Sequence, residues 1–490
     1  MKSTSLAVLG FIATLSACAA GPEYRRPDMQ LPQVFHNGGE IANGREIVNG
    51  GEVVHGGQAV ASAAPSPDVQ WWDGFHDPVL TRIIDRTLAQ NLDLAAAAAR
   101  VGEARAAAAH AGAALLPQGS LAASALRSHD SLQSPLGEVV HAVGGPRTYD
   151  TYAADAQSSW EVDLFGSLRR GREAAVAEAQ AAEVGQTAIR IAISAEAADA
   201  YLELRGLQAQ LQLADSQQAT QSHLVDLVQL RVGQGVASDR ELQRSIGELE
   251  RVRALKPALR AAIEAEMCRL DVLMGTPAGT HRAELAAAPI QPLPPQPAGS
   301  AVPALLLQRR PDIVIAERHL AAANARIGIA VAEYYPHLTF SGLLGFESID
   351  TSSLFSSAAL QSEALLGLRW RLFDFGRVDA EVAIARGRQG QALAAYRGTV
   401  LRATEDVEAA LSQFVESRSE AQVLTRQIAA LALARDEAQT AYEGGVLPLL
   451  EVLEADRDLL AARDRLATAN ANEARAAVAS FRALGGGWTG

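Results

Sequence analysis

Two stretches in the second half of the chain alternate between apolar and polar side chains with a period of two, the pattern of a half-buried β-strand. In the first stretch the apolar face carries Leu338, Phe340, Leu344 and Phe346, and the polar face carries His337, Thr339, Ser341 and Glu347. In the second stretch the apolar face carries Leu366, Leu368, Trp370 and Leu372, and the polar face carries Arg369 and Arg371. We therefore predict a β-hairpin over residues 337–374.

The first half of the chain contains a similar but weaker pattern over residues 118–164. There the apolar residues Ala154, Ala156, Trp160, Val162 and Leu164 oppose the polar residues Asp155, Gln157, Glu161 and Asp163. Each predicted strand has about ten residues, the length of a tilted membrane-spanning strand. An apolar outside and a charged inside fit a barrel with a wet lumen. One face of a soluble sheet alternates in the same way, so the pattern alone leaves both readings open.

Long segments rich in Ala, Glu, Gln and Arg follow each hairpin, at 167–232, 237–275, 377–442 and 448–483. This composition is typical of packed coiled-coil helices, in which alanine permits close approach. At about 1.5 Å per residue, the longer segments reach on the order of 100 Å. Short glycine-containing turns at 232–238 and 443–448 join the helices of each pair.

The two halves of the chain share ordered landmarks, which indicates an internal duplication. Trp160 and Gly166 recur as Trp370 and Gly376, and the turn dipeptide Gly235-Val236 recurs at the same offset as Gly445-Val446. Upstream of the strands the offset between equivalent residues is larger, because the first hairpin is longer than the second. Extra length of this kind is expected of a surface loop.

These patterns divide the chain into six parts. Residues 1–17 are a predicted signal peptide, and 18–75 an extended arm that contains a period-six, low-complexity insert at 37–60. Residues 76–288 form the first repeat. A proline-rich linker at 289–303 separates it from the second repeat at 304–484, and 485–490 is a C-terminal tail.

The N-terminus reads as a bacterial export signal. Lys2 is followed by a ten-residue apolar stretch that is too short to span a bilayer. The sequence Leu15-Ser16-Ala17-Cys18 then looks like a lipobox, in which the Cys18 thiol is acylated and becomes the mature N-terminus. Ala19 in place of aspartate favours the outer membrane by the usual bacterial sorting pattern.

Composition excludes several classes of protein. The 490 residues carry a formal charge of −13, which argues against nucleic-acid binding. No apolar run approaches the roughly 20 residues that a membrane-spanning helix needs, which excludes a helical membrane protein. The sequence contains no P-loop, HExxH or Gly-x-Ser-x-Gly motif and no metal-binding spacing of His and Cys. We therefore expect no enzyme activity, cofactor or metal.

Four strands cannot close a barrel in lipid, because unpaired backbone groups at open sheet edges cost several kcal/mol each. Two, three or four chains would supply 8, 12 or 16 strands. A dimer would leave little lumen, whereas twelve strands would leave a pore. The strand count therefore requires an oligomer, and a pore favours at least three chains.

The chain resembles the TolC-type outer-membrane factor family, in its NodT-like branch of RND efflux system outer-membrane lipoproteins. The resemblance spans nearly the whole chain. Its motifs are the lipobox, Gly21-Pro22-Glu23-Tyr24-Arg25-Arg26-Pro27, Trp71-Trp72 with Asp77-Pro78, Leu307-Gln308-Arg309-Arg310-Pro311-Asp312-Ile313, Tyr335-Pro336, Leu372-Phe373-Asp374-Phe375-Gly376 and Ala483-Leu484-Gly485-Gly486-Gly487-Trp488. The insert at 37–60 departs from the family pattern.

The resemblance implies a mixed α and β membrane protein with four transmembrane strands per chain and long coiled-coil helices in two structural repeats. It implies a homotrimer with a 12-stranded β-barrel on an α-helical barrel, lipid-anchored in the outer membrane and extending into the periplasm. It also implies docking to a periplasmic adaptor and an inner-membrane pump of the RND type. The expected function is a passive channel for drugs or other small molecules.

A gate is expected at the periplasmic helix tips. Glu451 and Glu454 are three residues apart and so share one helix face, and a three-fold axis would turn them into acidic rings that select for cations. The family places gate acids at these two positions. Arg240, Glu241 and Arg244 near the first tip are candidate gate partners, and Gly235, Val236, Gly445 and Val446 are candidate adaptor contacts. Solvated helix-face charges are the alternative reading.

Two other functions remain open from the sequence. The same channel would also serve a type I protein-secretion system, and only a deletion phenotype separates that role from efflux. A periplasmic coiled-coil lipoprotein scaffold without a pore is the third reading, and it would have no membrane strands and no conductance.

Overall fold

A computed structural model describes residues 19–29, 35, 70–286, 292–296 and 309–486 of the chain. The predicted signal peptide, Cys18, the insert at 37–60 and most of the linker lie outside these residues. The chain divides into two compact units. The sheet unit comprises Met1–Pro27, Val101–Ala182 and Ala316–Tyr396, and the helical unit comprises Asp28–Arg100, Glu183–Ile315 and Arg397–Gly490. Within the described residues, no helix is long and apolar enough to cross a membrane.

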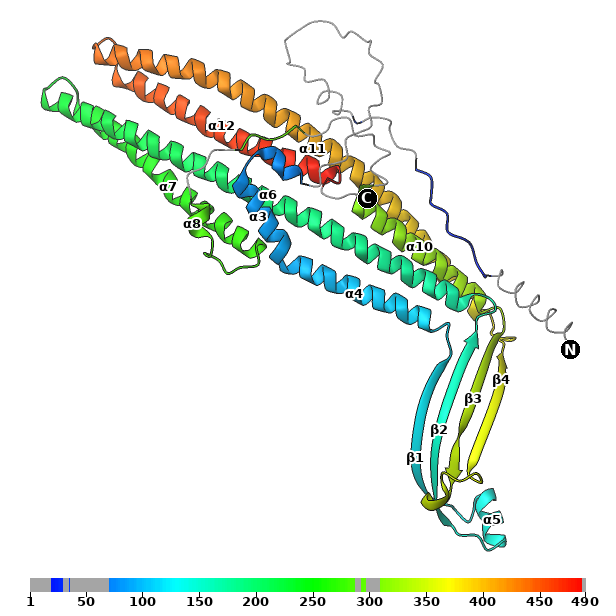
Figure 1. The fold of residues 1–490 in the computed structure, drawn as a ribbon. Helices are drawn as coiled ribbons and strands as arrows, with labels where there is room; N and C mark the ends of the chain where they lie inside the picture. Colours follow the sequence, from blue (N-terminus) through cyan, green and yellow to red (C-terminus); the bar gives the residue numbers. More distant parts are fainter. Residues whose placement is uncertain (1–18, 30–34, 36–69, 287–291, 297–308, 487–490) are drawn as a thin grey trace. The chain divides into compact units, whose positions relative to one another are not determined.

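The sheet unit is built on one antiparallel sheet of four strands in the order β1-β2-β3-β4 (Figure 1). The strands are β1 (Gln118–His129), β2 (Thr148–Val162), β3 (His337–Ser348) and β4 (Leu360–Arg369). The two predicted hairpins are therefore joined edge to edge, since β2 pairs with β3 in a register that sets Trp160 opposite Phe340.

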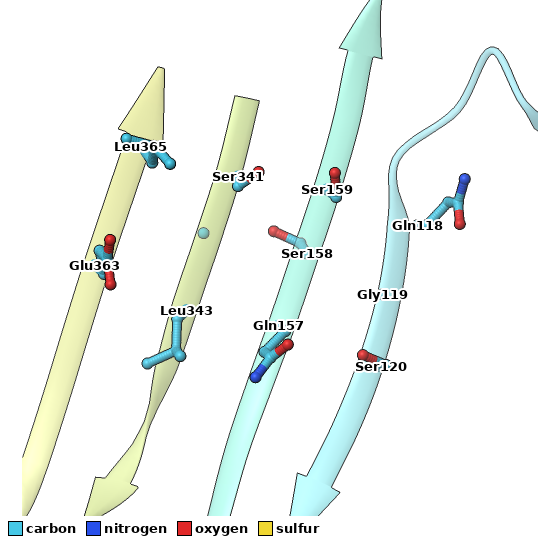
Figure 2. Close-up of a pocket in the computed structure, with 11 residues that line it drawn as sticks. Gln118, Gly119, Ser120, Gln157, Ser158, Ser159, Ser341, Leu343, Glu363 and Leu365 are labelled. Carbon is cyan, nitrogen blue, oxygen red and sulfur yellow. The ribbon is translucent and has the colours of Figure 1, made fainter. Parts of the chain in front are cut away.

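Side chains of directly paired residues lie on the same face of a sheet, so the register divides the strands into two faces. One face carries the row Ser120, Gln157, Leu343 and Glu363, and the next row carries Gln118, Ser159, Ser341 and Leu365. Figure 2 shows these side chains lining a shallow hollow of about 420 Å³. The opposite face carries Leu121, Trp160, Phe340, Leu344, Leu366 and Leu368, all of them exposed. The predicted alternation is thus present, with Leu343 and Leu365 as apolar exceptions on the polar face.

One polar contact crosses a whole strand of this sheet. The Asp155 carboxylate on β2 accepts a hydrogen bond from Gln361 Nε2 on β4 at 3.0 Å, although β3 lies between them. Gly345 on β3 makes this possible, because a Cβ there would lie 2.1 Å from Asp155 Oδ1. The glycine therefore lets the carboxylate lie flat against the sheet.

The strands are shorter at one end than the alternation predicts. β4 ends at Arg369, so Trp370 and Leu372 follow the strand. Asp163, predicted on the polar strand face, also follows its strand, and its carboxylate accepts hydrogen bonds from the Leu168 and Arg169 amides at the start of the next helix. A helix that the sequence pattern does not predict, α5 (Pro135–Ala142), lies in the β1–β2 connection.

The described part of the predicted arm contains no helix or strand before residue 70, but residues 20–26 are held tightly on the sheet unit. The Ala20 amide donates to Phe165 O at 2.9 Å, Asn324 donates to Pro22 O at 2.9 Å, and the Tyr24 hydroxyl donates to Glu317 at 3.3 Å. Gly21, at φ 87°, approaches the backbone of Gly328 so closely that a Cβ would lie 2.5 Å from its Cα.

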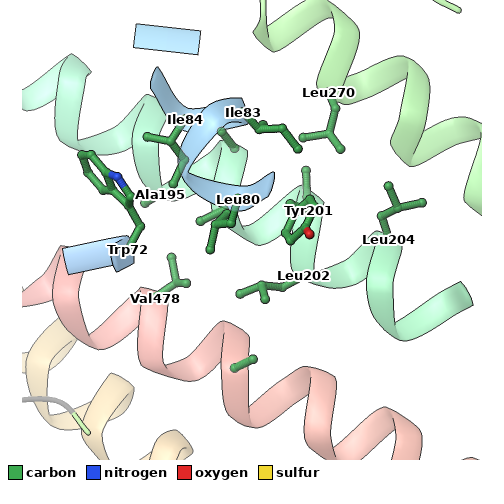
Figure 3. Close-up of a cluster of buried hydrophobic side chains, with 14 of the residues drawn as sticks. Trp72, Leu80, Ile83, Ile84, Ala195, Tyr201, Leu202, Leu204, Leu270 and Val478 are labelled. Atoms are coloured by element: carbon green, nitrogen blue, oxygen red, sulfur yellow. The ribbon is translucent and has the colours of Figure 1, made fainter. Parts of the chain in front are cut away.

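The hydrophobic core of the helical unit contains two adjacent buried tryptophans, Trp71 and Trp72. Trp71 and Trp72 are 2% exposed, and they begin the short helix η1 (Trp71–Phe75), which precedes α3 (Pro78–Gln90). Asp77 begins α3 by accepting the Val79 amide at 2.8 Å, and it also accepts the Tyr201 hydroxyl at 2.6 Å. Figure 3 shows the resulting cluster, in which side chains of α3, α6 and α12 converge.

The long helices begin and end within two residues of their predicted bounds. They are α6 (Ser167–Gly233), α7 (Asp239–Leu273), α11 (Arg377–Glu443) and α12 (Leu449–Ala483). α6 and α11 each have 67 residues, and α7 and α12 each have 35. The helices before the strands, α4 (Leu92–Ala113) and α10 (Pro311–Ala332), each have 22 residues. The duplication seen in the sequence landmarks is therefore also a duplication of helix lengths.

Equivalent hydrogen bonds hold the end of each helix pair that lies far from its tip turn; we call this end the root of the pair. Asn91, just before α4, donates to the carbonyl of Leu273, the last residue of α7, at 3.0 Å. Arg310, just before α10, donates to the carbonyl of Ala483, the last residue of α12, at 3.1 Å. Arg310 binds more partners than Asn91, because its guanidinium also contacts Ala403 O, Asp312 and Asp406.

Candidate functional site

Both tips of the helix pairs are turns with the same backbone structure, a Schellman motif. At the first tip the Val236 amide donates to Arg231 O at 2.9 Å and the Gly235 amide donates to Val232 O at 2.9 Å. At the second tip the Val446 and Gly445 amides donate to Ala441 O and Tyr442 O at 2.8 and 3.0 Å. Gly235 and Gly445 have φ of 73° and 74°, a left-handed conformation that favours glycine. The four candidate adaptor contacts are therefore the apex residues of two matching turns, and all four are exposed.

The helix that leaves the first tip, α7, begins with a capping box. The Ser238 side chain accepts the Glu241 amide, and the Glu241 carboxylate accepts the Ser238 amide at 2.8 Å. Two amides that lack partners within the helix are satisfied in this way. The carboxylate of Glu241, a candidate gate partner, therefore binds at the start of its own helix.

The helix that leaves the second tip, α12, begins without such a cap. Pro448 stands at the position equivalent to Ser238, and it makes no side-chain capping hydrogen bond. Glu451, the equivalent of Glu241, consequently has neither an N-cap amide nor a hydroxyl to accept from. Within the described residues, neither the Glu451 nor the Glu454 carboxylate makes a hydrogen bond or an ion pair, and both are exposed on the same helix face, while Val452 and Leu453 between them are buried.

The basic candidates do not meet these acids within the chain. Arg240 and Arg244 are exposed on α7, and the described residues hold no ion pair between either arginine and Glu451 or Glu454.

Three sets of contacts join the two helix pairs near their tips within one chain: an arginine–tyrosine contact, an apolar cluster and an ion pair. Arg231 donates to Tyr442 O at 3.2 Å, and its guanidinium lies 4.3 Å from the centre of the Tyr442 ring. An apolar cluster drawn from the helices of both pairs lies beside this contact; its buried members are Leu224, Val228, Tyr442, Leu449, Val452 and Leu453. Burial raises the pKa of the Tyr442 hydroxyl, so this ring stays neutral at ordinary pH.

The third contact lies farther from the tips. Arg457 on α12 donates to Glu248 on α7 at 2.7 Å, and Arg251 donates to the other oxygen of Glu248, also at 2.7 Å. Burial alone would raise the pKa of Glu248, but the hydrogen bonds from Arg251 and Arg457 lower it below its usual value. The bridge therefore holds a charged carboxylate between two arginines.

Sequence patterns did not point to Arg231, Tyr442, Glu248 and Arg457 as contacts between the tips. Only the capping box has a local sequence signal, because Ser238 and Glu241 have the Ser-x-x-Glu spacing that typically starts a helix. The other two pairs join residues from different halves of the chain, and no local pattern reports them.

The remaining site predictions concern lipid and metal. Cys18, the predicted lipidation site, lies outside the described residues. In the part of the chain that the structure describes, no three His, Cys, Asp or Glu side chains group as metal ligands would.

Comparison with known proteins identifies the kind of molecule that carries these tips. The family model described as outer membrane efflux protein matches residues 83–276 and 302–486. The pyoverdine export outer membrane protein OpmQ of Pseudomonas putida is 31% identical over 87% of this chain and 90% of its own length. Nodulation protein T of Rhizobium leguminosarum is 27% identical over 100% of this chain and 98% of its own length.

Solved structures agree with the sequence matches. The outer-membrane channel OprN superposes with a TM-score of 0.81 at 31% identity, covering 96% of this chain and 100% of its own. The structure of CusC superposes with a TM-score of 0.78 at 26% identity, covering 96% and 100%. These relatives are outer-membrane channel proteins rather than enzymes.

Proposed function

The chain belongs to the outer membrane efflux protein family and is an outer-membrane efflux channel that extends into the periplasm, and on this premise we propose that its gate is formed by Glu451 and Glu454. The predicted function class is thereby confirmed, whereas the gate is a proposal. The pump supplies the energy for transport, and this chain supplies the conduit.

One observation carries the gate proposal: the Glu451 and Glu454 carboxylates are exposed on one face of α12, in its first two turns after the second tip, and make no hydrogen bond or ion pair among the described residues. Like charges one helical turn apart repel each other and attract cations. Around a three-fold axis the pair becomes two acidic rings at a constriction, which favour cations and can hold the gate closed through partners of opposite sign.

We further propose that three chains combine their four-stranded sheets into a twelve-stranded barrel. Each sheet supports this arrangement, because β1 and β4 are its edge strands and one face is apolar and exposed. Open edges are not tolerated in lipid, and pairing β4 of one chain with β1 of the next removes them.

Partners and anchorage complete the proposal. The exposed turn residues Gly235, Val236, Gly445 and Val446 contact a periplasmic adaptor, which connects the channel to an inner-membrane pump of the RND type. Acylation of Cys18 anchors the N-terminus in the outer membrane, and the bound segment at residues 20–26 supports this, because it ties the adjoining chain to the sheet unit.

Conductance tests the gate directly. In planar bilayers, the double variant Glu451→Ala/Glu454→Ala is expected to conduct more in the open state and to lose block by multivalent cations. Unchanged conductance together with unchanged block would exclude these residues as the gate.

A further inference from the structure

The sheet of one chain has two open edges, the outer edge of β1 and the outer edge of β4 (Figure 1). β2, which is paired on both sides, continues to Val162, because its last residues pair with β3 after its pairing with β1 has ended at Ser159. β4 is paired on one side, and it ends at Arg369, where its pairing with β3 ends. The exposed residues Trp370 and Leu372 continue its alternation past that point. β4 therefore ends early for want of a neighbouring strand, although its sequence continues the strand pattern.

The two hairpins have the same internal register. In the first hairpin, Gln118 pairs with Ser159. In the second hairpin, His337 pairs with Arg369. In both pairs the first residue follows a proline and the second precedes a tryptophan. The hairpins are therefore equivalent residue by residue, so a contact of β2 with β3 predicts the contact that β4 makes with β1 of another chain.

This equivalence selects one register for the junction between chains. Trp160 on β2 lies opposite Phe340 on β3. Trp370 is the equivalent of Trp160 on β4. Leu121 is the equivalent of Phe340 on β1, since each is the fourth residue after its proline. We propose that β4 of one chain pairs with β1 of the next in the register that sets Trp370 opposite Leu121, a junction that we call the seam. The seam rests on the proposed twelve-stranded barrel and specifies how its chains are joined.

The side chains fit this register on both faces of the sheet. Leu365 and Leu126, which are 55% and 59% exposed, both lie on the otherwise polar face, and the seam sets them opposite each other. Two leucines that face water in a single chain then cover each other. On the apolar face, Leu366 and Leu368 lie opposite alanines of β1, so large side chains meet small ones. No charged side chain in the seam faces another charged side chain.

Neighbouring registers fit less well. A shift of one residue would turn the apolar face of one chain toward the polar face of the next. A shift of two residues keeps the faces, but in one direction it sets Glu363 opposite Leu126. In the other direction it sets Arg127 opposite Leu366. Both place a charged group against a leucine, where it loses water without gaining a partner. The side chains therefore favour the register that the internal equivalence predicts.

Disulfide cross-linking between chains tests the register. The full chain, purified in detergent with Cys268→Ala, carries Leu365→Cys together with Leu126→Cys. The shifted controls combine Leu365→Cys with Ser124→Cys or with Ser128→Cys. Directly opposite residues lie about 4.5–5.5 Å apart and diagonal ones about 7–8 Å, beyond the reach of a disulfide. Within one chain the two positions lie on opposite edge strands, with β2 and β3 between them, so a disulfide joins only different chains.

Mild oxidation should convert the matched pair into covalent dimers and trimers on a denaturing gel without reductant, about tenfold or more faster than either shifted pair. Leu366→Cys with Ala125→Cys is a second matched pair on the other face of the sheet, and it should cross-link too. It guards against poor geometry at one position, because hydrogen-bonded and non-hydrogen-bonded pairs alternate along antiparallel strands. Chains with only one added cysteine should stay monomeric on the same gel.

The outcomes separate the seam from the barrel. Cross-linking that is fastest for a shifted pair overturns the register, while the three-chain barrel stands. If light scattering of the reduced protein shows three chains per particle but neither matched pair cross-links, the seam is overturned and the trimer stands. Chains that stay single in detergent overturn the barrel, and the seam with it.

Discussion

The two tips have the same backbone but use the same carboxylate differently. Each turn is a Schellman motif with a left-handed glycine, and the helices on either side have matching lengths. At the first tip Glu241 binds the amide of Ser238, whereas at the second tip Pro448 replaces the serine and Glu451 is left exposed. A single change at the N-cap therefore separates a carboxylate that caps its own helix from one that is exposed and makes no hydrogen bond or ion pair among the described residues.

The roots of the two halves differ in a comparable way. Asn91 holds the first root with one side-chain hydrogen bond to Leu273 O, and it also caps α4 through the Asp93 and Leu94 amides. Arg310 holds the second root through two carbonyls and two carboxylates. The helix lengths and turns are thus the same in both halves. The second half differs in having more side-chain hydrogen bonds at its root and an exposed carboxylate at its tip.

The largest expected effect is at the second root. Arg310→Ala leaves two carbonyls and two solvent-accessible carboxylates without their donor, and we expect a loss of about 2–3 kcal/mol of stability. Asn91→Ala loses one hydrogen bond and a cap, for about 1–2 kcal/mol. Thermal unfolding of both variants in detergent measures the difference, and equal shifts in Tm would contradict the unequal roles.

The next effect concerns the second tip. Pro448→Ser restores the capping box, so it should draw the Glu451 carboxylate onto its own helix start and stabilise α12 by about 1 kcal/mol. Conductance should then change toward that of Glu451→Gln. Pro448→Ala supplies the backbone N–H of the N-cap but no hydroxyl, so it separates the contribution of the amide from that of the hydroxyl. Native conductance in both the serine and the alanine variant would show that the N-cap does not control the carboxylate.

The reverse change at the first tip is smaller. Ser238→Ala breaks the capping box and should cost about 1 kcal/mol at the start of α7. Hydrogen exchange of the first-turn amides of α7 should become faster, while those of α12 should not change. Faster exchange at both tips, or at neither, would show that Ser238 is not a local cap.

The smallest effect is a pH dependence of the bridge between the helix pairs. The pKa of Glu248 is lowered in the folded chain, so the bridge contributes fully above the unfolded pKa of a glutamate and is lost as pH falls through the lower folded value. Arg457 is half-exposed, so the contribution is at most about 0.5 kcal/mol. Unfolding of Arg457→Gln should show a weaker dependence on acid than the native chain, and identical acid profiles would contradict the assignment.

Much of the fold could be predicted because its signals are local. Helix and strand periodicity, glycines at the turns and the repeated Trp and Gly landmarks predict the long helices within two residues and the four strands in their order along the chain. The alternation of apolar and polar residues in the sequence continues to Trp370, one residue past the end of β4. The Trp370 side chain is not paired within the sheet, and its indole donates a hydrogen bond to Tyr334 O at 3.0 Å. Trp160 makes the equivalent contact with Leu115 O.

The tips show where local reasoning fails. The sequence predicts Glu241 as a gate partner from its place near a tip; the structure adds a hydrogen bond from the Ser238 amide to its carboxylate, and its role at the gate stays a prediction. Pairs such as Arg231 with Tyr442 depend on how four helices pack, which no local spacing encodes. The Glu451 and Glu454 carboxylates are exposed and make no hydrogen bond or ion pair among the described residues, and their role in gating stays a prediction.

The most direct measurement of the difference between the tips is multivalent-cation block of single channels in planar bilayers. It compares Glu451→Gln/Glu454→Gln with Glu241→Gln, a change of the same chemistry at the equivalent position of the first tip. We predict that the double variant loses block and conducts more, while Glu241→Gln retains the native block. Equal block in both variants and the native channel would contradict the claim that the duplicated carboxylate is free to act only at the second tip.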